Sequence, residues 1–280
     1  MKRKIVSNRI LQDYLKQLAD EEKCSNTREK YKRDIEKFIE FTEGRPVTKA
    51  IVVEFKKKLK DNYKPLSVNS MLAAVNGILS YMGLHDCKVK TLRIQKKMFC
   101  SESRELHEAD CEKLIRVAKR KGQERIQLII TTISGTGIRV SELKYITVES
   151  LADGKAVIDN KGKIRVIFIN NELCKMLALY ARKHDINEGA IFITKTGKAV
   201  DRSNVWREMK SLCKEAGVDP EKVFPHNLRG LFAKLYYELH KDISKLADLL
   251  GHANIETTRG YIMHSGNEHC LQINQMRIVK

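Results

Sequence analysis

The hydrophobic pattern of the first third of the chain is helical almost throughout. Across residues 8–85, apolar side chains recur at steps of three and four, which places them on one face of an α-helix. The opening segment shows this period at Ile10, Leu11, Tyr14, Leu15 and Leu18. Ser25 or Thr27 is expected to cap a second helix, which closes at Gly44. A four-helix unit is predicted, with its last two helices at about residues 48–60 and 66–83.

The pattern weakens between about residues 87 and 105, where the chain becomes basic and shows no clear core-facing period. This stretch is predicted to be an interdomain linker. The boundaries that follow are a helical first domain at residues 1–88, a linker at 89–105 and a second domain at 106–280 that ends in a tail, 266–280. A chain of 280 residues is long enough for two domains of ordinary size.

Beyond the linker the pattern predicts a mostly helical second domain with a small antiparallel sheet, so the fold class is mainly α with an α+β second domain. A capped amphipathic helix is expected within residues 106–120, and a buried helix, a glycine turn and the start of another helix within 126–146. Two β-type runs, Ala156–Asp159 and Ile164–Ile169, flank the turn Asn160-Lys161-Gly162-Lys163 and predict a hairpin. The remaining predicted elements are a helix near 171–184, a short strand at Ala190–Ile193, and helices near 201–216, 226–240, 242–250 and 254–261.

The charge balance indicates a polyanionic partner. Lys and Arg number 53 against 35 Asp and Glu, a formal net charge of +18, and more than half of this excess lies within residues 1–105. Nucleic acid is the partner that such a balance favours, and a basic linker could follow a phosphate backbone. For any single helix, a solvated basic face is the alternative. A membrane is disfavoured because the sequence has no run of about 18 apolar residues, so the protein is expected to be soluble and cytoplasmic.

The seven cysteines are odd in number, widely scattered and free of any Cys-x-x-Cys pair. They are predicted to be reduced thiols, most of them buried. This disfavours a disulfide scaffold, a zinc finger and a Cys/His metal centre for catalysis, so no metal site is expected.

Two short strings carry candidate chemistry. The string PHNLRGLFA places His226 and Arg229 three positions apart, on one face of a helix, although a surface pair on a basic helix fits equally well. The string TGIRVSEL places Arg139 just after a glycine turn, where the backbone can approach a ligand and a helix N-terminus offers free N–H groups. A salt bridge from Arg139 to Glu142 is the structural alternative, and it would also orient the guanidinium.

A third string, LLGHANIETTRGYIM, places Tyr261 nine positions after His252; near helix ends such residues most often pack or face solvent. The order of the whole set changes this interpretation: Arg139, Lys161 in the hairpin, His226 with Arg229, His252 and Tyr261. This arrangement resembles the tyrosine recombinases, which include the phage integrases and the Xer-type chromosome resolvases. Their signature is an Arg in TG-x-R-x-x-E-L, a hairpin Lys, His-x-x-Arg, LGH, and a Tyr nine residues beyond that His. All six positions hold the expected residue in the expected order.

The resemblance spans the whole chain, because the family's usual plan is a helical core-binding domain ahead of a catalytic domain. Its specific motifs lie within residues 106–265. Gly230-Leu231 stands where the family commonly has an aromatic or polar pair, and Gly260 directly precedes the tyrosine. These departures flank the chemistry and could alter the mobility of the tyrosine segment. Some relatives use a tryptophan in the phosphate pocket; since His252 fills that role here, Trp206 is expected to pack in the core.

The resemblance implies cleavage of a DNA phosphodiester without a metal ion. Arg139 and Arg229 would hold the nonbridging oxygens, because planar guanidiniums fit phosphate oxygens and stay charged. His252 would donate a further hydrogen bond. These three side chains would stabilise the charge that develops as the pentacovalent transition state forms.

In the same scheme Tyr261 is the nucleophile and leaves a 3′-phosphotyrosyl bond. A phenol with a pKa of about 10 attacks poorly at neutral pH, so His226 is placed to accept or relay its proton. The hairpin lysine would protonate the leaving 5′ oxygen. Lys161 aligns best with this role and Lys163 is the rival. No ATP or other cofactor is then required, because the phosphotyrosyl bond retains the energy of the cleaved one.

The partners implied are double-stranded DNA, a homotetramer acting on two recombination sites, and accessory DNA-bending or directionality proteins. The tail carries an apolar set that predicts packing onto a neighbouring subunit: Leu271, Ile273, Met276 and Ile278. Two alternatives stay open, a type IB topoisomerase-like relaxing enzyme and a DNA-binding protein on the same fold that has lost catalysis. The sequence does not reveal the target site, or whether the task is integration, excision, inversion or chromosome-dimer resolution; a simple Xer-like or mobile-element recombinase is expected.

Overall fold

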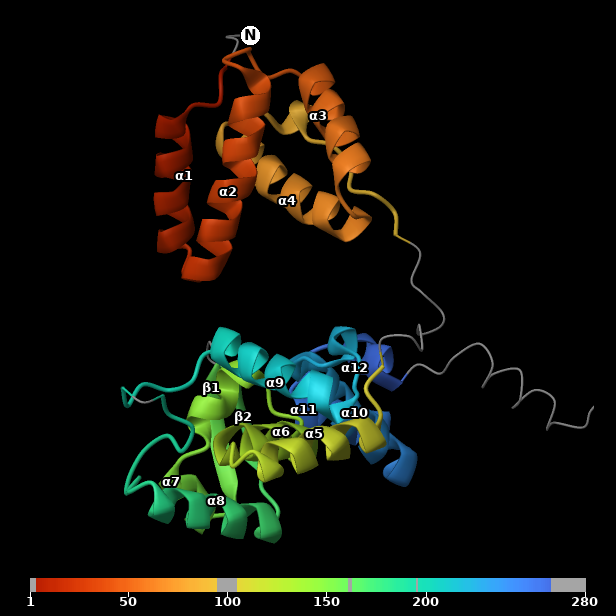
Figure 1. Ribbon diagram of the computed structural model, residues 1–280. Helices are drawn as coiled ribbons and strands as arrows, with labels where there is room; N and C mark the ends of the chain where they lie inside the picture. The colour runs from red at the N-terminus through yellow and green to blue at the C-terminus, as the bar shows by residue number, and fades with distance from the viewer. Residues whose placement is uncertain (1–3, 95–104, 161–162, 195, 263–280) are drawn as a thin grey trace, which may run out of the picture. The chain divides into compact units, whose positions relative to one another are not determined.

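The computed structural model describes residues 4–94, 105–160, 163–194 and 196–262 (Figure 1). The chain forms two compact units, Met1–Lys96 and Lys97–Lys280. Each unit has its own buried apolar core, as expected when two segments of ordinary domain size fold separately.

The first unit is a bundle of four helices built around the apolar helix α4. The helices are α1 (Asn8–Asp20), α2 (Ser25–Thr42), α3 (Lys49–Asn62) and α4 (Pro65–Tyr81), followed by a 3₁₀ turn at His85–Cys87 (Figure 1). Leu72 and Ile78 of α4 pack with Phe38 of α2, and all three are fully buried. The helical period of the sequence therefore comes from positions that face one shared core.

The start of α2 differs from its prediction. The helix already includes Ser25, and the last residue with extended backbone is Cys24, at φ −60° and ψ 151°. The prediction that Ser25 or Thr27 caps this helix was therefore wrong; the Cys24 thiol instead contacts the Thr27 hydroxyl at 3.0 Å. Helix α3 starts in the usual way, with the Thr48 hydroxyl accepting a hydrogen bond from a backbone amide in the first turn.

Two asparagines of α4 form hydrogen bonds with the segment that follows the last helix of this unit. Asn76 accepts a hydrogen bond from the Val89 amide at 3.0 Å and donates one to the Val89 carbonyl at 2.8 Å. Asn69, two turns earlier, makes the same pair of bonds with Leu92, at 2.7 and 2.9 Å. The beginning of the stretch that lacked periodicity thus packs on the first unit, because side-chain amides replace strand partners for its backbone.

The second unit packs helices around the buried helix α6, with one hairpin at its side. The elements are α5 (Glu108–Arg120), α6 (Glu124–Thr136), α7 (Val148–Ala152), β1 (Lys155–Asn160), β2 (Lys163–Phe168), α8 (Asn171–Lys183), α9 (Arg202–Ala216), α10 (Pro225–His240), α11 (Ile243–Leu250) and α12 (Ile255–Ile262), with 3₁₀ segments at Val140–Tyr145 and Pro220–Lys222. Helix α6 contacts α5, α8, α9 and α10, and its Ile129, Ile130 and Ile133 are fully buried. The predicted fold class is confirmed.

The predicted hairpin is present as an antiparallel pair in which Val157 lies opposite Val166. A predicted strand at Ala190–Ile193 was wrong: this segment makes only isolated bridges in the described part of the chain, at Ala190 and at Ile193. Its apolar run is explained by burial, because Ile191 and Phe192 are fully covered without a neighbouring strand.

The prediction that Trp206 packs in the core was also wrong. Its side chain is 47% exposed, and the Lys210 ammonium lies 5.4 Å from the ring centroid. Helix α9 faces the core with Val205, Met209 and Leu212, a stripe at the helical period. Trp206 follows Val205 by one position, so the helix turns it about 100° away from that stripe.

Helices α10, α11 and α12 form a small separate cluster at the C-terminal end of the described residues (Figure 1). Ala233, Leu246 and Leu250 are fully buried in it, and Phe232 and Tyr261 pack against them. Among the residues that the structure describes, no helix has the length and apolarity needed to span a membrane.

Candidate active site

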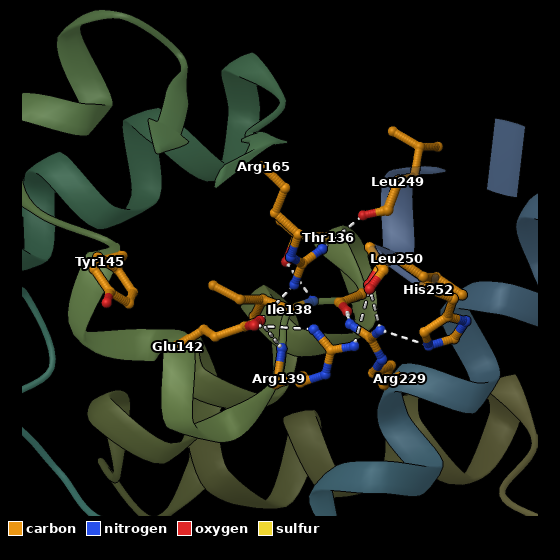
Figure 2. Close-up of polar contacts among 12 residues, drawn as sticks. Thr136, Ile138, Arg139, Glu142, Tyr145, Arg165, Arg229, Leu249, Leu250 and His252 are labelled. Carbon is orange, nitrogen blue, oxygen red and sulfur yellow. Dashed lines mark hydrogen bonds and ion pairs between the residues drawn. The ribbon is translucent and has the colours of Figure 1, made fainter. Parts of the chain in front are cut away.

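Arg139 follows directly from the turn that ends α6. Gly137 closes the helix at φ +64°, and a Cβ at that position would lie 2.4 Å from a ring carbon of Phe232. Both facts require glycine here. The next turn brings the Arg139 Nη1 within 3.0 Å of Glu142, which also accepts the Arg139 amide at 2.9 Å (Figure 2). The salt bridge considered from the sequence is therefore present, and it holds a guanidinium whose side chain is still 37% exposed.

Glu142 is a buried carboxylate at the centre of this site. Only 2% of its surface is exposed, and it pairs with Arg165 of β2 as well as with Arg139 (Figure 2). Burial alone would raise the pKa of the Glu142 carboxyl. The hydrogen bond from the Arg139 amide and the charge of Arg165 outweigh burial, so the pKa lies below its usual value. The carboxylate is therefore charged at neutral pH and fixes both guanidiniums.

Arg229 lies deeper than Arg139, with 2% of its surface exposed. Its Nη1 donates to the Gly137 carbonyl, and its Nη2 donates to the Leu250 carbonyl at 2.6 Å and to His252 Nε2 at 2.9 Å (Figure 2). Helix α10 thus points Arg229 inward and leaves His226 at the surface. Burial lowers the pKa of Arg229 to about 10, so this group is still charged at neutral pH.

The ring of His252 is held from both sides. Since a guanidinium can only donate, the Arg229 contact makes Nε2 an acceptor, and the ring proton sits on Nδ1. That proton is donated to the Thr258 hydroxyl, 2.8 Å away on α12. Burial, followed by the charges of Arg229 and Arg139, lowers the pKa of His252 to about 4, so the imidazole is neutral.

Tyr261 lies over this group of side chains. Its hydroxyl is 3.2 Å from His226 Nδ1, and its ring stacks on His252 with centroids 5.6 Å apart and planes 7° from parallel. Gly230 leaves room for the ring, because a Cβ there would be 3.3 Å from Tyr261 Cδ1. The phenol, both histidines and both arginines singled out from the sequence therefore come together, although they lie up to 122 positions apart in the sequence.

The surroundings of His226 lower the pKa of its ring. The protein around its ring removes water even though the residue is at the surface, and the positive charges of Arg229 and Arg202 add to this effect. The pKa of His226 is accordingly below its usual value. A neutral imidazole at neutral pH has one nitrogen with a free lone pair, which is what a base needs.

The hairpin lysine is the one predicted site residue whose side chain the structure does not describe. Lys161 lies outside the described residues, and Lys163 is placed only as the first residue of β2. The same strand does reach the site, because Arg165 of β2 bonds to the Leu249 carbonyl at 2.7 Å (Figure 2). The tail predicted to pack on a neighbouring subunit, 266–280, also lies outside the described residues.

Two residues of the site, Arg165 and Thr258, were not predicted from the sequence. Arg165 sits at an inward position of β2, but the sequence carries no signal for this, because the apolar residues Ile164, Val166 and Phe168 alternate with it and would be assigned to the core face. Thr258 is fully buried and its hydroxyl lies 2.8 Å from His252 Nδ1, but a threonine in a helix has no distinctive pattern either. In the described ranges there is no cluster of three or more His, Cys, Asp or Glu side chains suited to a metal ion.

Comparison with known sequences relates most of the chain to one family. A profile of the phage integrase family matches residues 104–268, the range that contains every candidate residue. The "Tyrosine recombinase XerA" of Pyrococcus furiosus is 30% identical over 269 residues, which cover 93% of this chain and 91% of the relative. The "Tyrosine recombinase XerD" of Vibrio cholerae is 26% identical over 273 residues, covering 90% and 89%.

Solved structures share the fold. A lambda integrase dimer bound to a COC′ core site superposes with a TM-score of 0.74 at 18% identity, covering 93% of this chain and 96% of that one. A XerH site-specific recombinase bound to its difH substrate gives a TM-score of 0.67 at 22% identity, with 89% and 78% covered. At these identities the likeness concerns the arrangement of the elements.

Proposed function

The chain belongs to the phage integrase family, the tyrosine recombinases, and we propose that Tyr261 is the side chain with which it cleaves and rejoins DNA. The protein is a tyrosine-type site-specific DNA recombinase. In the proposed step the Tyr261 oxygen attacks the scissile phosphorus, a 3′-phosphotyrosyl bond forms, and the bond to the 5′ oxygen breaks.

One observation carries this assignment: the Tyr261 hydroxyl lies 3.2 Å from His226 Nδ1, and the same side chain interacts with Arg229. A phenol is a weak nucleophile until its proton is removed. His226 is within hydrogen-bond reach, and its lowered pKa leaves it neutral and able to accept that proton. The hydroxyl and its base belong to the same chain, so one protomer can supply both.

Arg139 and Arg229 supply the positive charge that the transition state requires. Preorganised donors of this kind typically contribute about 3–4 kcal/mol each to catalysis. Arg139 is half-exposed and can meet a phosphate oxygen as it stands. Arg229 is engaged with two carbonyls and with His252, so its contact to phosphate requires Nη2 to turn away from the imidazole.

When Arg229 turns toward the phosphate, His252 becomes able to donate a hydrogen bond to the phosphate as well. While Arg229 donates to Nε2, the proton of His252 is committed to Thr258. Once Arg229 turns to the phosphate, Nε2 can take up the proton through a change of tautomer, and the Thr258 hydroxyl can donate to Nδ1 instead. His252 then offers an N–H to a phosphate oxygen, as expected from the sequence.

The leaving 5′ oxygen takes its proton from the hairpin lysine in this scheme, with Lys161 as the proposed acid and Lys163 as the alternative. The phosphotyrosyl linkage retains the energy of the cleaved bond, so the proposed reaction consumes no ATP and uses no metal ion. Attack by a 5′-hydroxyl of another strand reverses the step and exchanges the strands. Attack by the original strand restores the starting DNA.

Binding of duplex DNA is the function that we propose for the two units together. The first unit, with residues 1–88 as its helical part, would grip the duplex as a core-binding domain, since it carries much of the net charge of +18. The second unit, residues 106–280, would hold the scissile phosphate. Exchange between two sites calls for four protomers on paired DNA, with accessory DNA-bending or directionality proteins as further partners.

The test is covalent capture of DNA on the protein. With a nicked duplex that loses its short 5′-hydroxyl fragment after cleavage, the parent protein should accumulate a covalent complex, and Tyr261→Phe should form none. Tyr237→Phe, on α10 in the same cluster, is the matched control and should react like the parent. Capture of DNA by Tyr261→Phe at the parent rate would refute the assignment.

A further inference from the structure

A charged side chain occupies an inward position of β2. The outward positions of this strand are exposed and apolar: Ile164, Val166 and Phe168. On the inward side Ile167 is 2% exposed, and Arg165 shares that side with only 12% of its side chain exposed. A guanidinium at this depth destabilises a fold unless it is paired and hydrogen-bonded. Its partners therefore indicate why it is there.

Arg165 joins three segments that are far apart in sequence. Its Nη2 pairs with Glu142, in the 3₁₀ segment after Arg139, and its Nη1 donates to the Leu249 carbonyl at 2.7 Å, near the end of α11 (Figure 2). The hydrophobic part of the side chain lies against Gly251, where a Cβ would come within 2.4 Å of Arg165 Cδ. One side chain thus connects the hairpin, the Arg139 turn and the turn that precedes His252.

The contact with Glu142 determines how Arg139 is held. A carboxylate and a guanidinium otherwise form a two-pronged pair that uses both oxygens. Here Oε2 is taken by Arg165 and by the Arg139 amide, and Arg139 Nη1 bonds to Oε1 at 3.0 Å. The other terminal nitrogen of Arg139 has only a 3.3 Å contact to the Gly251 carbonyl. Arg165 therefore keeps part of the Arg139 guanidinium available for a phosphate.

The contact with the α11 end determines where His252 lies. Gly251 adopts φ +62°, and its missing side chain lets Arg165 pass directly beneath the turn. Since Leu249 is anchored by the same guanidinium, this turn cannot shift relative to β2 without breaking a bond to a buried charge. The carbonyl of the intervening Leu250 binds Arg229, so the turn is held from two sides.

We propose that Arg165 is a positioning residue of the recombinase: through Glu142 and Leu249 it aligns Arg139 and His252 for the scissile phosphate, and it does not itself touch DNA. This inference rests on the proposed function of the site. It gives the hairpin a second task besides carrying the lysine, because its strand sets the geometry of the two phosphate-binding groups.

The experiment separates DNA binding from cleavage in Arg165→Gln and Arg165→Lys. Single-turnover formation of the covalent complex is measured on the nicked duplex at saturating protein, and the dissociation constant is measured on intact duplex. A displacement of about 1 Å at reacting groups slows a reaction about 100-fold, so cleavage by Arg165→Gln should fall about 10- to 100-fold. Arg165→Lys keeps the charge but cannot span both partners, and it should lose less. DNA affinity should change less than about twofold, because phosphate contacts by exposed cations dominate it.

Arg125→Gln is the matched control. Arg125 bonds to the Glu208 carboxylate at 2.6 Å and to the Ile193 carbonyl at 2.8 Å, the same kinds of partner, and neither belongs to the site. Its loss should leave the cleavage rate unchanged. Thermal unfolding of each variant shows whether the fold is kept; if Arg165→Gln does not fold, Arg165→Lys must show the loss in cleavage at unchanged affinity.

A double-mutant cycle with Arg139→Lys asks whether Arg165 acts through Arg139. If it does, Arg165→Gln should slow the Arg139→Lys protein much less than it slows the parent. Fully additive effects, an unchanged cleavage rate in Arg165→Gln, or a loss of affinity as large as the loss in rate would each overturn the inference. Failure of the parent protein itself to capture DNA is a different result, and it would overturn the proposed function first.

Discussion

Gly230→Ala tests whether cleavage depends on the position in which the Tyr261 ring packs against α10. In the structure a Cβ at position 230 would lie 3.3 Å from Tyr261 Cδ1 and 3.7 Å from Cε1. Carbon atoms in contact settle at about 3.5–4.0 Å, so the ring must move by roughly 0.2–0.7 Å. If about 1 Å costs about 100-fold, a shift of this size corresponds to a loss of about 3- to 25-fold in the cleavage rate.

The same substitution should stabilise the protein. Gly230 lies inside α10, and alanine in place of glycine within a helix contributes about 0.5–1 kcal/mol. For a unit of this size that corresponds to a rise of about 1–4 °C in melting temperature, less whatever the contact with the ring costs. A variant that melts at a higher temperature yet cleaves more slowly cannot be explained by damage to the fold.

The assay is single-turnover capture of the nicked duplex, with calorimetry of the same samples. Gly135→Ala in α6 is the control, because a Cβ there meets no heavy atom within 4 Å; it should change stability alone. A Gly230→Ala protein that melts at a higher temperature and cleaves at the parent rate would refute the reasoning. In that case the Tyr261 ring would move away from Gly230 before the reaction.

Two further predictions follow from the structure. Because the pKa of His226 lies below 6.5, the cleavage rate should stay level as the pH falls through 6.5 and decline only at lower pH, when protonation removes the acceptor; a decline centred at or above 6.5 in the rate–pH profile would contradict its role. Asn76→Ala removes both hydrogen bonds to Val89 and should lower the free energy of urea unfolding by about 1–3 kcal/mol, whereas Asn62→Ala, which loses a single exposed bond, should change it little.

Most elements of this protein could be predicted from the sequence because their causes are local. The three- and four-residue period reports a buried helix face wherever that face lies, and it predicted α1 to α4 and most helices of the second unit. The failures also have local explanations. Ala190–Ile193 is apolar because Ile191 and Phe192 are buried, and burial alone does not distinguish a strand from an irregular segment. Trp206 is large and apolar, but its position on α9 leaves it exposed.

The residues of the site were predicted by type and order, and their geometry was not. The motif identifies Arg139, Arg229 and His252 as a group, yet it does not say that Arg229 is buried against two carbonyls while Arg139 stays accessible. Those differences arise from which face of α10 packs inward and where the turn after α11 brings its carbonyls. Both depend on contacts between segments that no local pattern encodes.

The sequence by itself determined which side chains are available to serve as nucleophile, cation and base, since reactivity belongs to the side-chain type. Tertiary structure alone decided the protonation and accessibility of those groups. Arg165 reaches Glu142 across 23 positions, and Arg229 reaches Gly137 across 92. The tautomer of His252, the lowered pKa of His226 and the partial exposure of Arg139 all depend on such contacts. Desolvation and neighbouring charge act through space and are not fixed by position along the chain.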